Sequence, residues 1–136
     1  MKLGEAQERV ADFMAAGGQL KERLESFQLP DGLTFRRRLA MLEEELGELK
    51  EAWVDEDDVA FVDAWTDLLY VLLGGVEESG FDIEPMFGAV CDANDAKIDW
   101  EKCEPFVTRE DGKILKPEGW VGPEEKIASY LLGKES

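Results

Sequence analysis

The sequence has no histidine, few basic residues and only two cysteines, and each scarcity excludes a class of chemistry. Without histidine, Ser-His-Asp and Cys-His nucleophilic sites and histidine-ligated zinc are excluded. The 32 acidic residues outnumber the 15 basic ones, and the resulting net charge of −17 argues against nucleic acid or an anionic membrane surface as the main partner. Cys91 and Cys103 show no metal-ligand spacing and form no disulfide framework, so we expect reduced thiols.

Long hydrophobic runs are also missing. The longest, residues 68–76, is about half as long as the roughly 20 residues of a membrane-spanning helix. The N-terminus, MKLGEAQERV, is polar and has no apolar signal core. We therefore expect a cytoplasmic protein without a membrane or nucleic-acid partner. With 44% hydrophobic and 10% aromatic residues, the 136-residue chain can build a core, which excludes global disorder.

Hydrophobic periodicity is helical along most of the chain and predicts an all-α helical bundle. We expect a single domain over residues 1–136, with a helical core at about 5–99 and an irregular, substrate-contacting tail at about 100–136. Residues 109–113 predict a tight turn. The expected helices cover residues 5–16, 34–53, 59–78, 85–99 and 123–132, with a further helical stretch at 19–27.

Polar residues and glycines mark the ends of these helices. The pair Gly17 and Gly18 should stop the first helix. Thr34 is the predicted N-cap of the second, and Asp57 or Asp58 is expected to cap the third.

The two long helices carry different apolar patterns. The second has one stripe that should face the bundle core. The third is apolar nearly all round and is expected to be the central, most buried element. The stripe consists of Leu39, Leu42, Leu46, Leu49 and Trp53.

Two carboxylates interrupt the most apolar helix. Asp63 and Asp67 are four residues apart and therefore lie on one face, at or near the expected core. Burying two unpaired carboxylates is costly and raises their pKa values unless cations hold them ionised. A hydrogen bond or a buried arginine accounts for one such aspartate, whereas a pair on one face favours a divalent-metal site.

The preceding helix offers a matching acidic flank, formed by Glu44, Glu45 and Glu48. By itself this flank is typical of a solvated surface. If the two long helices pack antiparallel, however, it turns toward the aspartates, and four or five carboxylates converge. Oxygen-only ligation selects Mg²⁺ or Mn²⁺ over zinc and copper.

Such a metal site favours phosphate chemistry, because metals can bridge carboxylates to a polyanionic nucleotide. Basic side chains would hold the remaining phosphate charge. The candidates are Arg36, Arg37, Arg38, Lys97, Arg109, Lys113 and Lys116.

The segment EELGE at residues 44–48 resembles the EExxE motif of the all-α nucleoside triphosphate pyrophosphohydrolases, the MazG-like superfamily. That superfamily includes dimeric dUTPases and phosphoribosyl-ATP pyrophosphohydrolases. DLLYV at 67–71 is similar to the family's second motif, and ANDAK at 93–97 to its Asn-x-x-Lys segment. DGKILKPEGW at 111–120 resembles the tail of a MazG-like subgroup. The resemblance covers about residues 34–125.

One position departs from the family pattern. The second motif is usually ExxD, but Ala64 stands where the glutamate is expected, three residues before Asp67. Asp63 offers a carboxylate one turn before Asp67 and could take that role.

The resemblance implies Mg²⁺-dependent hydrolysis of a nucleoside triphosphate between its α and β phosphates, giving a monophosphate and pyrophosphate, in a house-cleaning or dUTP-type role. It also implies a homodimer or homotetramer whose four-helix core is completed across the interface. For Trp120, cover of the nucleotide and pinning of the tail to the bundle are equal alternatives. The residues carried over are Glu44, Glu48, Asp63 and Asp67 as metal ligands, Glu45 as the group that orients or deprotonates the attacking water, and Asn94, Lys97, Lys113, Lys116 and Trp120 as substrate contacts.

Two other functions remain open from the sequence. The first keeps the enzyme but changes its substrate to phosphoribosyl-ATP. The second is a non-enzymatic acidic helical protein, such as a nucleic-acid mimic, which accounts for the charge but not for two aspartates inside the most apolar helix.

Overall fold

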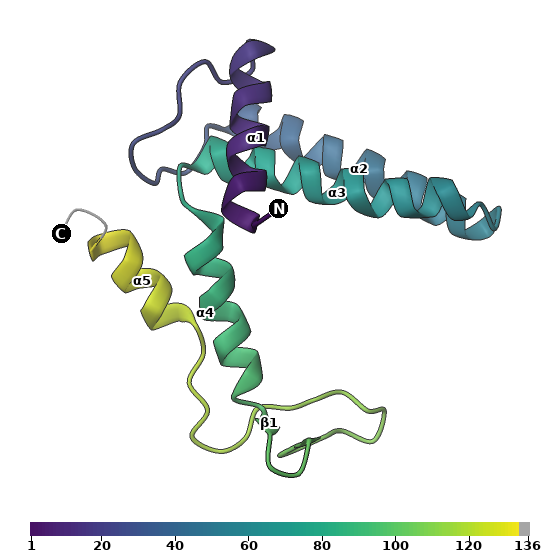
Figure 1. Cartoon of the computed structure of the whole chain (residues 1–136), viewed down its shortest axis with the longest axis vertical. Coiled ribbons are helices and arrows are strands. Elements are labelled where there is room, and N and C mark those ends of the chain that lie inside the picture. Colours follow the sequence, from purple (N-terminus) through teal and green to yellow (C-terminus); the bar gives the residue numbers. More distant parts are fainter. Residues whose placement is uncertain (134–136) are drawn as a thin grey trace. The chain divides into compact units, whose positions relative to one another are not determined.

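A computed structural model describes residues 1–133 and confirms the predicted all-α class, with 62% of these residues in helices (Figure 1). The chain divides into two compact units, Met1–Ile83 and Glu84–Ser136. The helices are α1 (Leu3–Ala16), α2 (Gly32–Val54), α3 (Asp58–Ser79), α4 (Ile83–Asp95) and α5 (Glu124–Gly133), and two short strands are β1 (Ile98–Asp99) and β2 (Glu104–Pro105).

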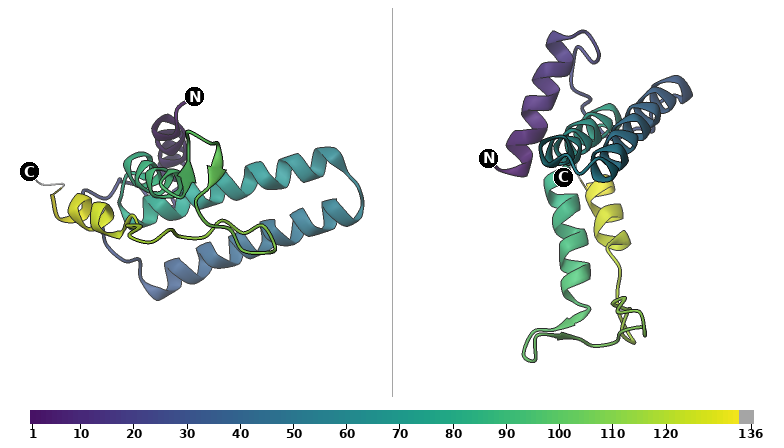
Figure 2. Two further views of the ribbon diagram at one scale, coloured as in Figure 1. Left: turned by 90° about the horizontal axis from the view of Figure 1, so that it is seen from below. Right: turned by 90° about the vertical axis from the view of Figure 1, so that its right-hand side faces the viewer.

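The first unit is built on an antiparallel hairpin of the two long helices, α2 and α3, which lie side by side (Figure 2). Asp57 caps α3 as predicted, because its side chain accepts a hydrogen bond from the backbone N–H of Ala60. The predicted cap Thr34 is wrong. The cap of α2 is Asp31, whose Oδ1 accepts a hydrogen bond from the backbone N–H of Thr34 at 2.8 Å. The helix therefore begins at Gly32, before Thr34.

Helix α1 packs against the C-terminal part of α3. Val10 and Met14 of α1 form a buried cluster with Leu73 of α3. Beside it lies a buried polar contact, in which the Nε2 of Gln7 donates to Glu77 at 2.6 Å. Arg23 adds a two-pronged ion pair to the same Glu77 carboxylate, at 2.9 Å for each hydrogen bond. A buried charge is tolerated when it is paired in this way, so these contacts anchor the hairpin to α1.

The helical stretch predicted at residues 19–27 is wrong. Helix α1 stops at the two glycines as predicted, and Gly18 adopts a positive φ of 76°. The following segment is irregular because it crosses the end of α3: the backbone N–H of Gln28 donates to Ser79 O. Gly80 has a φ of 75° and lies so close to Ser26 O that a Cβ would clash. Tertiary contact therefore overrides local helix propensity here.

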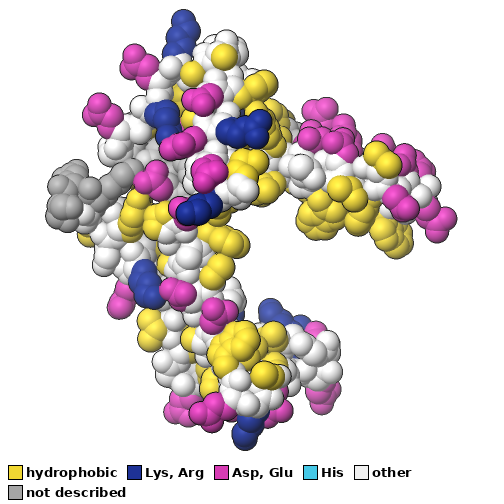
Figure 3. Space-filling view, in the orientation of Figure 1, with side chains coloured by type: hydrophobic (Ala, Val, Ile, Leu, Met, Phe, Trp, Pro, Cys, Tyr) yellow, Lys and Arg dark blue, Asp and Glu magenta, His cyan; other side chains and the backbone are white. Residues whose placement is uncertain are grey.

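The apolar stripe of α2 only partly reaches a core within one chain. Leu49 is 8% exposed, but Leu46 is 43% and Trp53 is 71% exposed. The stripe was predicted to face the bundle core, and within the single chain only part of it is covered. Helix α3, expected to be the most buried element, likewise leaves Val62 and Trp65 more than half exposed. Figure 3 shows hydrophobic side chains gathered along one edge of the hairpin, with acidic ones along the other.

Helix α3 is also long and apolar enough, by length and composition, to cross a membrane. A core helix that is mostly buried in a soluble protein passes the same test, whereas 22% of this window is buried within the single chain. Asp63 and Asp67 lie near the middle of α3, and carboxylates within hydrocarbon are costly. A bundle accounts for this pattern better than a bilayer does, and the absence of a membrane partner stays a prediction.

The second unit contains α4, the two short strands, a long loop and α5. Helix α4 ends at Asp95 rather than at the predicted residue 99, because the chain then turns into the strand pair in which Ile98 faces Pro105. The predicted turn at 109–113 is confirmed by the hydrogen bond from Arg109 N to Lys113 O at 2.8 Å. The predicted terminal helix is confirmed as α5.

Candidate active site

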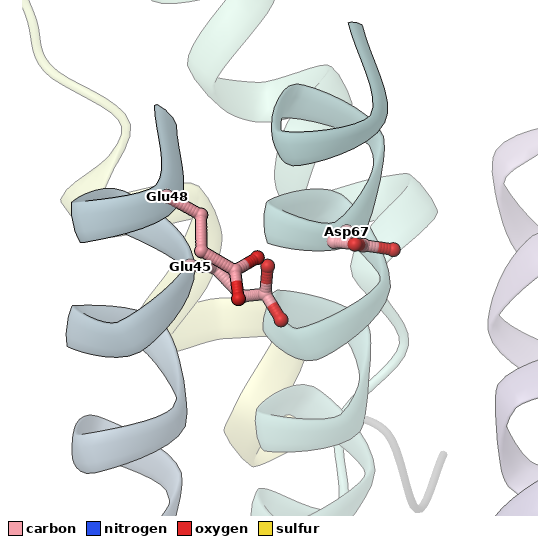
Figure 4. A group of neighbouring side chains, drawn as sticks. All are labelled: Glu45, Glu48 and Asp67. Atoms are coloured by element: carbon pink, nitrogen blue, oxygen red, sulfur yellow. The ribbon is translucent and has the colours of Figure 1, made fainter. Parts of the chain in front are cut away.

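Three of the predicted carboxylates converge between the two long helices. Glu45 and Glu48 lie one turn apart on α2, and Asp67 lies on the facing helix α3 (Figure 4). One oxygen from each of the three carboxylates can be chosen so that all lie within 4.8 Å of one another. Antiparallel packing of the two helices was expected to bring four or five carboxylates together, and among the described residues three meet this distance.

Glu45 has the most perturbed environment of the three. Burial raises its pKa to about 7, and a hydrogen bond to Glu48 and the negative charges of Glu48, Asp67 and Glu44 act in the same direction. Its Oε2 is shielded from solvent and has no hydrogen-bond partner. A shielded carboxylate oxygen without a partner is unusual in a folded protein, and it fits a positively charged ligand.

Asp67 is half-buried, and its pKa is also raised. Burial is the largest cause, followed by the charge of Asp63, the charge of Glu48 and a hydrogen bond to Asp63. Within the described residues, the ion pairs of the protein involve other acidic side chains, so no lysine or arginine neutralises the Glu45, Glu48 and Asp67 group.

The group therefore fits a hard divalent cation. Its donors are all carboxylate oxygens, which are the ligands that Mg²⁺ and Mn²⁺ prefer. A cation would bind the unpartnered Glu45 Oε2 and relieve the mutual repulsion that raises the pKa values of Glu45 and Asp67. The residues that could hold it in this geometry are Glu45, Glu48 and Asp67.

The remaining two predicted ligands, Glu44 and Asp63, lie outside this group. Glu44 is exposed, and its negative charge contributes to the raised pKa of Glu45. Asp63 was expected at or near the core, and this is wrong for the single chain, in which it is exposed. The buried position on that turn is Ala64, at 1% exposure. The face of α3 toward the core thus carries a methyl group where the family motif has a carboxylate.

The predicted substrate contacts belong to the second unit, where four of the five gather. Asn94 Oδ1 accepts a hydrogen bond from Lys97 Nζ at 3.1 Å. Lys97 and Lys116 each place their ammonium nitrogen 5.0 Å from the centroid of the Trp120 ring. Lys113 lies apart from them in the tight turn, where its backbone N–H donates to Asp111.

Trp120 is attached to α4. Its indole N–H donates to the backbone oxygen of Ala93 at 2.7 Å. The alternative in which Trp120 pins the tail to a helix is therefore confirmed, while cover of a nucleotide stays a prediction.

Two arginines considered as phosphate contacts have structural partners. Arg38 forms an ion pair with Glu78 at 2.8 Å, and both side chains are largely buried. Arg109 pairs with Asp111 inside the tight turn. Glu77 and Glu78 at the end of the apolar helix α3 were not among the predicted functional residues. Their position in the sequence could have predicted these ion pairs, because acidic side chains at the end of a buried helix need cationic partners.

Comparison with known protein families agrees with the family resemblance of the sequence motifs. The sequence profile of the phosphoribosyl-ATP pyrophosphohydrolase family matches residues 12–94, which include the three converging carboxylates. No curated protein matches the chain closely. The matched region spans more than half of the chain and contains the C-terminal end of α1 and all of the α2–α3 hairpin. The chain thus belongs to the phosphoribosyl-ATP pyrophosphohydrolase family of the MazG-like all-α superfamily, and it is a pyrophosphohydrolase, a hydrolase of acid anhydrides.

Proposed function

We propose that the protein is a Mg²⁺-dependent nucleoside triphosphate pyrophosphohydrolase that cleaves between the α and β phosphates. The observation that carries the proposal is the shielded, unpartnered oxygen of Glu45 in a group with Glu48 and Asp67. A divalent cation bound there supplies neutralisation of phosphate charge and activation of water. Mn²⁺ is the expected substitute.

The carboxylates divide the work between binding and proton transfer. Glu48 and Asp67 would hold the cation from opposite helices, with Glu44 and Asp63 as further predicted ligands. Glu45 would accept the proton of the attacking water. Metal binding lowers the pKa of Glu45, so this carboxyl is ionised when the site is loaded.

The oligomeric state is part of the proposal. The apolar side chains that one chain leaves exposed on the hairpin support a homodimer or homotetramer, because soluble monomers rarely expose contiguous apolar surface. The largest of these exposures on α3 are Val59, Val62, Trp65 and Leu72. Sedimentation velocity would show a single chain of 15.3 kDa if this part of the proposal is wrong.

The substrate is proposed to be a nucleoside triphosphate of a house-cleaning or dUTP type. The name of the matched family favours phosphoribosyl-ATP as the second candidate. Both reactions release pyrophosphate, so one assay compares them. Pyrophosphate release would be measured with Mg²⁺ across the canonical nucleoside triphosphates, dUTP, modified triphosphates and phosphoribosyl-ATP, and the highest kcat/KM identifies the substrate.

Variants of the carboxylate group test the mechanism. Glu48→Gln and Asp67→Asn are expected to abolish pyrophosphate release while leaving a folded oligomer, as judged by circular dichroism and sedimentation. Glu51→Gln is the matched control, because Glu51 is an exposed glutamate of α2 outside the group. Full activity in both purified site variants would contradict the metal-site assignment.

A further inference from the structure

The side chain of Arg38 on α2 lies across two consecutive glycines of the facing helix α3. A Cβ at Gly74 would lie 2.5 Å from Arg38 Nη1, and a Cβ at Gly75 would lie 3.2 Å from Arg38 Cγ. Glycine in a helix interior is unfavourable relative to alanine. The space that the Arg38 side chain occupies therefore accounts for two glycines in succession within α3.

Arg38 is bound at two points along α3. Its Nε donates to Glu78 Oε1 at 2.8 Å, and its Nη1 donates to Val71 O at 3.4 Å. The side chains of Arg38 and Glu78 are only 11% and 15% exposed, so salt and solvent screen their ion pair little. Val71 and Glu78 are seven residues apart, which is about two helical turns. One side chain of α2 thus fixes both the spacing of the two helices and their alignment along the helix axis.

The apolar contacts of α2 define this alignment less well. The structure describes all of α2, and its buried residues are Leu49 and Ala52, both near the short loop at 55–57 that leads into α3. Apolar contacts are non-directional, whereas a planar guanidinium binds its partners in a defined geometry. The loop therefore holds one end of the hairpin, and the Arg38 contact holds the other.

The carboxylate group lies between these two fixed points. Glu45 comes seven residues after Arg38, and Asp67 comes seven residues before Gly74. In an antiparallel pair, equal steps of about 10 Å along each helix lead from one facing position to the next. The contact between Arg38 and α3 therefore also places Glu45 opposite Asp67. Metal–ligand distances tolerate deviations of only about 0.2 Å, so a displacement of about 1–2 Å between the helices would open the site.

We propose that Arg38 is a positioning residue of the candidate active site. Its ion pair with Glu78, made across the two glycines, holds the carboxylates of α2 at the distance from Asp67 that a divalent cation requires. In this role Arg38 touches neither the cation nor the substrate. The inference rests on the proposed function for the bound group, but the alignment of the helices can be measured without metal.

The alignment is tested on the full chain in EDTA. Spin labels are attached at Arg36 of α2 and Asp58 of α3, which are both exposed, after the two native cysteines have been replaced by serine. Dilution with unlabelled protein leaves label pairs within one chain, and pulsed EPR measures their separation. Arg38→Met should shift the mean separation by about 1–2 Å or broaden its distribution. An unchanged distribution would overturn the proposal.

Metal binding is tested on the unlabelled protein by calorimetric titration with Mg²⁺ and by EPR of bound Mn²⁺. Arg38→Met should weaken Mg²⁺ binding about tenfold or more, as is typical when a group that orients metal ligands is lost, and should alter the Mn²⁺ spectrum. Arg38→Lys keeps a positive charge beside Glu78 and should recover part of the affinity. Gln7→Leu, which destabilises the same unit through α1, is the control and should bind Mg²⁺ like the wild type.

The two glycines provide a graded pair of variants. Alanine at either position raises the helix propensity of α3 equally. Gly74→Ala displaces the guanidinium and should weaken Mg²⁺ binding as Arg38→Met does. Gly75→Ala meets only the flexible stem of Arg38 at 3.2 Å and should weaken it less.

Two further results would overturn the proposal. One is an unchanged Mg²⁺ affinity in Arg38→Met that circular dichroism shows to be folded. The other is an equal loss in Gln7→Leu, which would mean that reduced stability alone weakens the site. A wild-type protein that binds no Mg²⁺ refutes the proposed function, and the label separations then still decide whether Arg38 aligns the helices.

Discussion

Binding of Mg²⁺ should release a proton from Glu45, and this linkage is the most direct test of the candidate active site. The pKa of Glu45 is raised to about 7 by burial, by its hydrogen bond to Glu48 and by nearby negative charges. A cation at the carboxylate group favours the ionised form of Glu45 and lowers this pKa. Metal binding and deprotonation are therefore coupled.

The magnitude follows from the pKa. At pH 7 roughly half of the molecules carry the Glu45 proton, so binding one Mg²⁺ should release roughly half a proton. Release should fall toward zero by about pH 9, where Glu45 is already ionised. Below pH 7 the Mg²⁺ affinity should decrease roughly tenfold per pH unit, because the cation must displace a whole proton.

Isothermal titration of the wild-type protein with Mg²⁺ in two buffers of different ionisation enthalpy measures the number of protons released. Glu45→Gln removes the titrating group and should bring the release at pH 7 close to zero. Glu51→Gln, on the same helix but outside the group, should behave like the wild type. The reasoning is refuted if the wild type releases no proton at pH 7, or if Glu45→Gln releases as many.

The other predictions concern stability. Because the folded-state pKa of Glu45 is raised from 4.5 to about 7, its stabilising contribution is present below the unfolded pKa and is lost as pH rises through about 7. The raised pKa of Asp67 acts in the same direction. Thermal melts without metal should show this loss, and Mg²⁺ should reverse it at pH 8. Gly74→Ala places a Cβ 2.5 Å from Arg38 Nη1 and displaces that side chain from its ion pair. The lost charged hydrogen bonds, about 1.5–3 kcal/mol, exceed the gain of about 1 kcal/mol in helix propensity, so urea unfolding should show a net loss of about 0.5–2 kcal/mol. Gly88→Ala, where a Cβ meets open space, should stabilise instead. Gln7→Leu removes one hydrogen bond from Glu77, which keeps its ion pair with Arg23, and leaves the backbone groups of Phe81 and Ile83 without their side-chain partner; it should cost about 2–4 kcal/mol in the same assay. An unchanged unfolding midpoint in this variant would contradict the role of the buried contact.

Local signals in the sequence predicted most of the helices. Periodicity placed each long helix to within about two residues, and the two glycines after α1 marked its end. The helix predicted at residues 19–27 does not form, because the contacts at Ser79 and Gly80 determine the path of the chain there. Those contacts join segments about 50 residues apart. The predicted cap of α2 was wrong because aspartate and threonine are both good N-caps. Only the path by which the chain enters the helix decides between Asp31 and Thr34.

The burial of the apolar stripe could not be predicted from a helical wheel. A wheel identifies a face that avoids water but does not say what covers it. Leu49 is buried by other residues of the same chain, whereas Trp53 and Trp65 remain exposed. The same reasoning applies to Asp63, whose apolar neighbours suggested burial although its own face of α3 is open in the single chain.

The sequence by itself determined the helical class, the family motif and the two acidic helix faces, because spacing along a helix decides which side chains share a face. Only the tertiary structure decided which carboxylates meet. It brought Glu45, Glu48 and Asp67 together and left Glu44 and Asp63 outside. It also shielded one oxygen of Glu45 and gathered two lysines around Trp120. Burial, charge repulsion and ring contacts depend on distances between segments, and these distances exist only after the chain has folded.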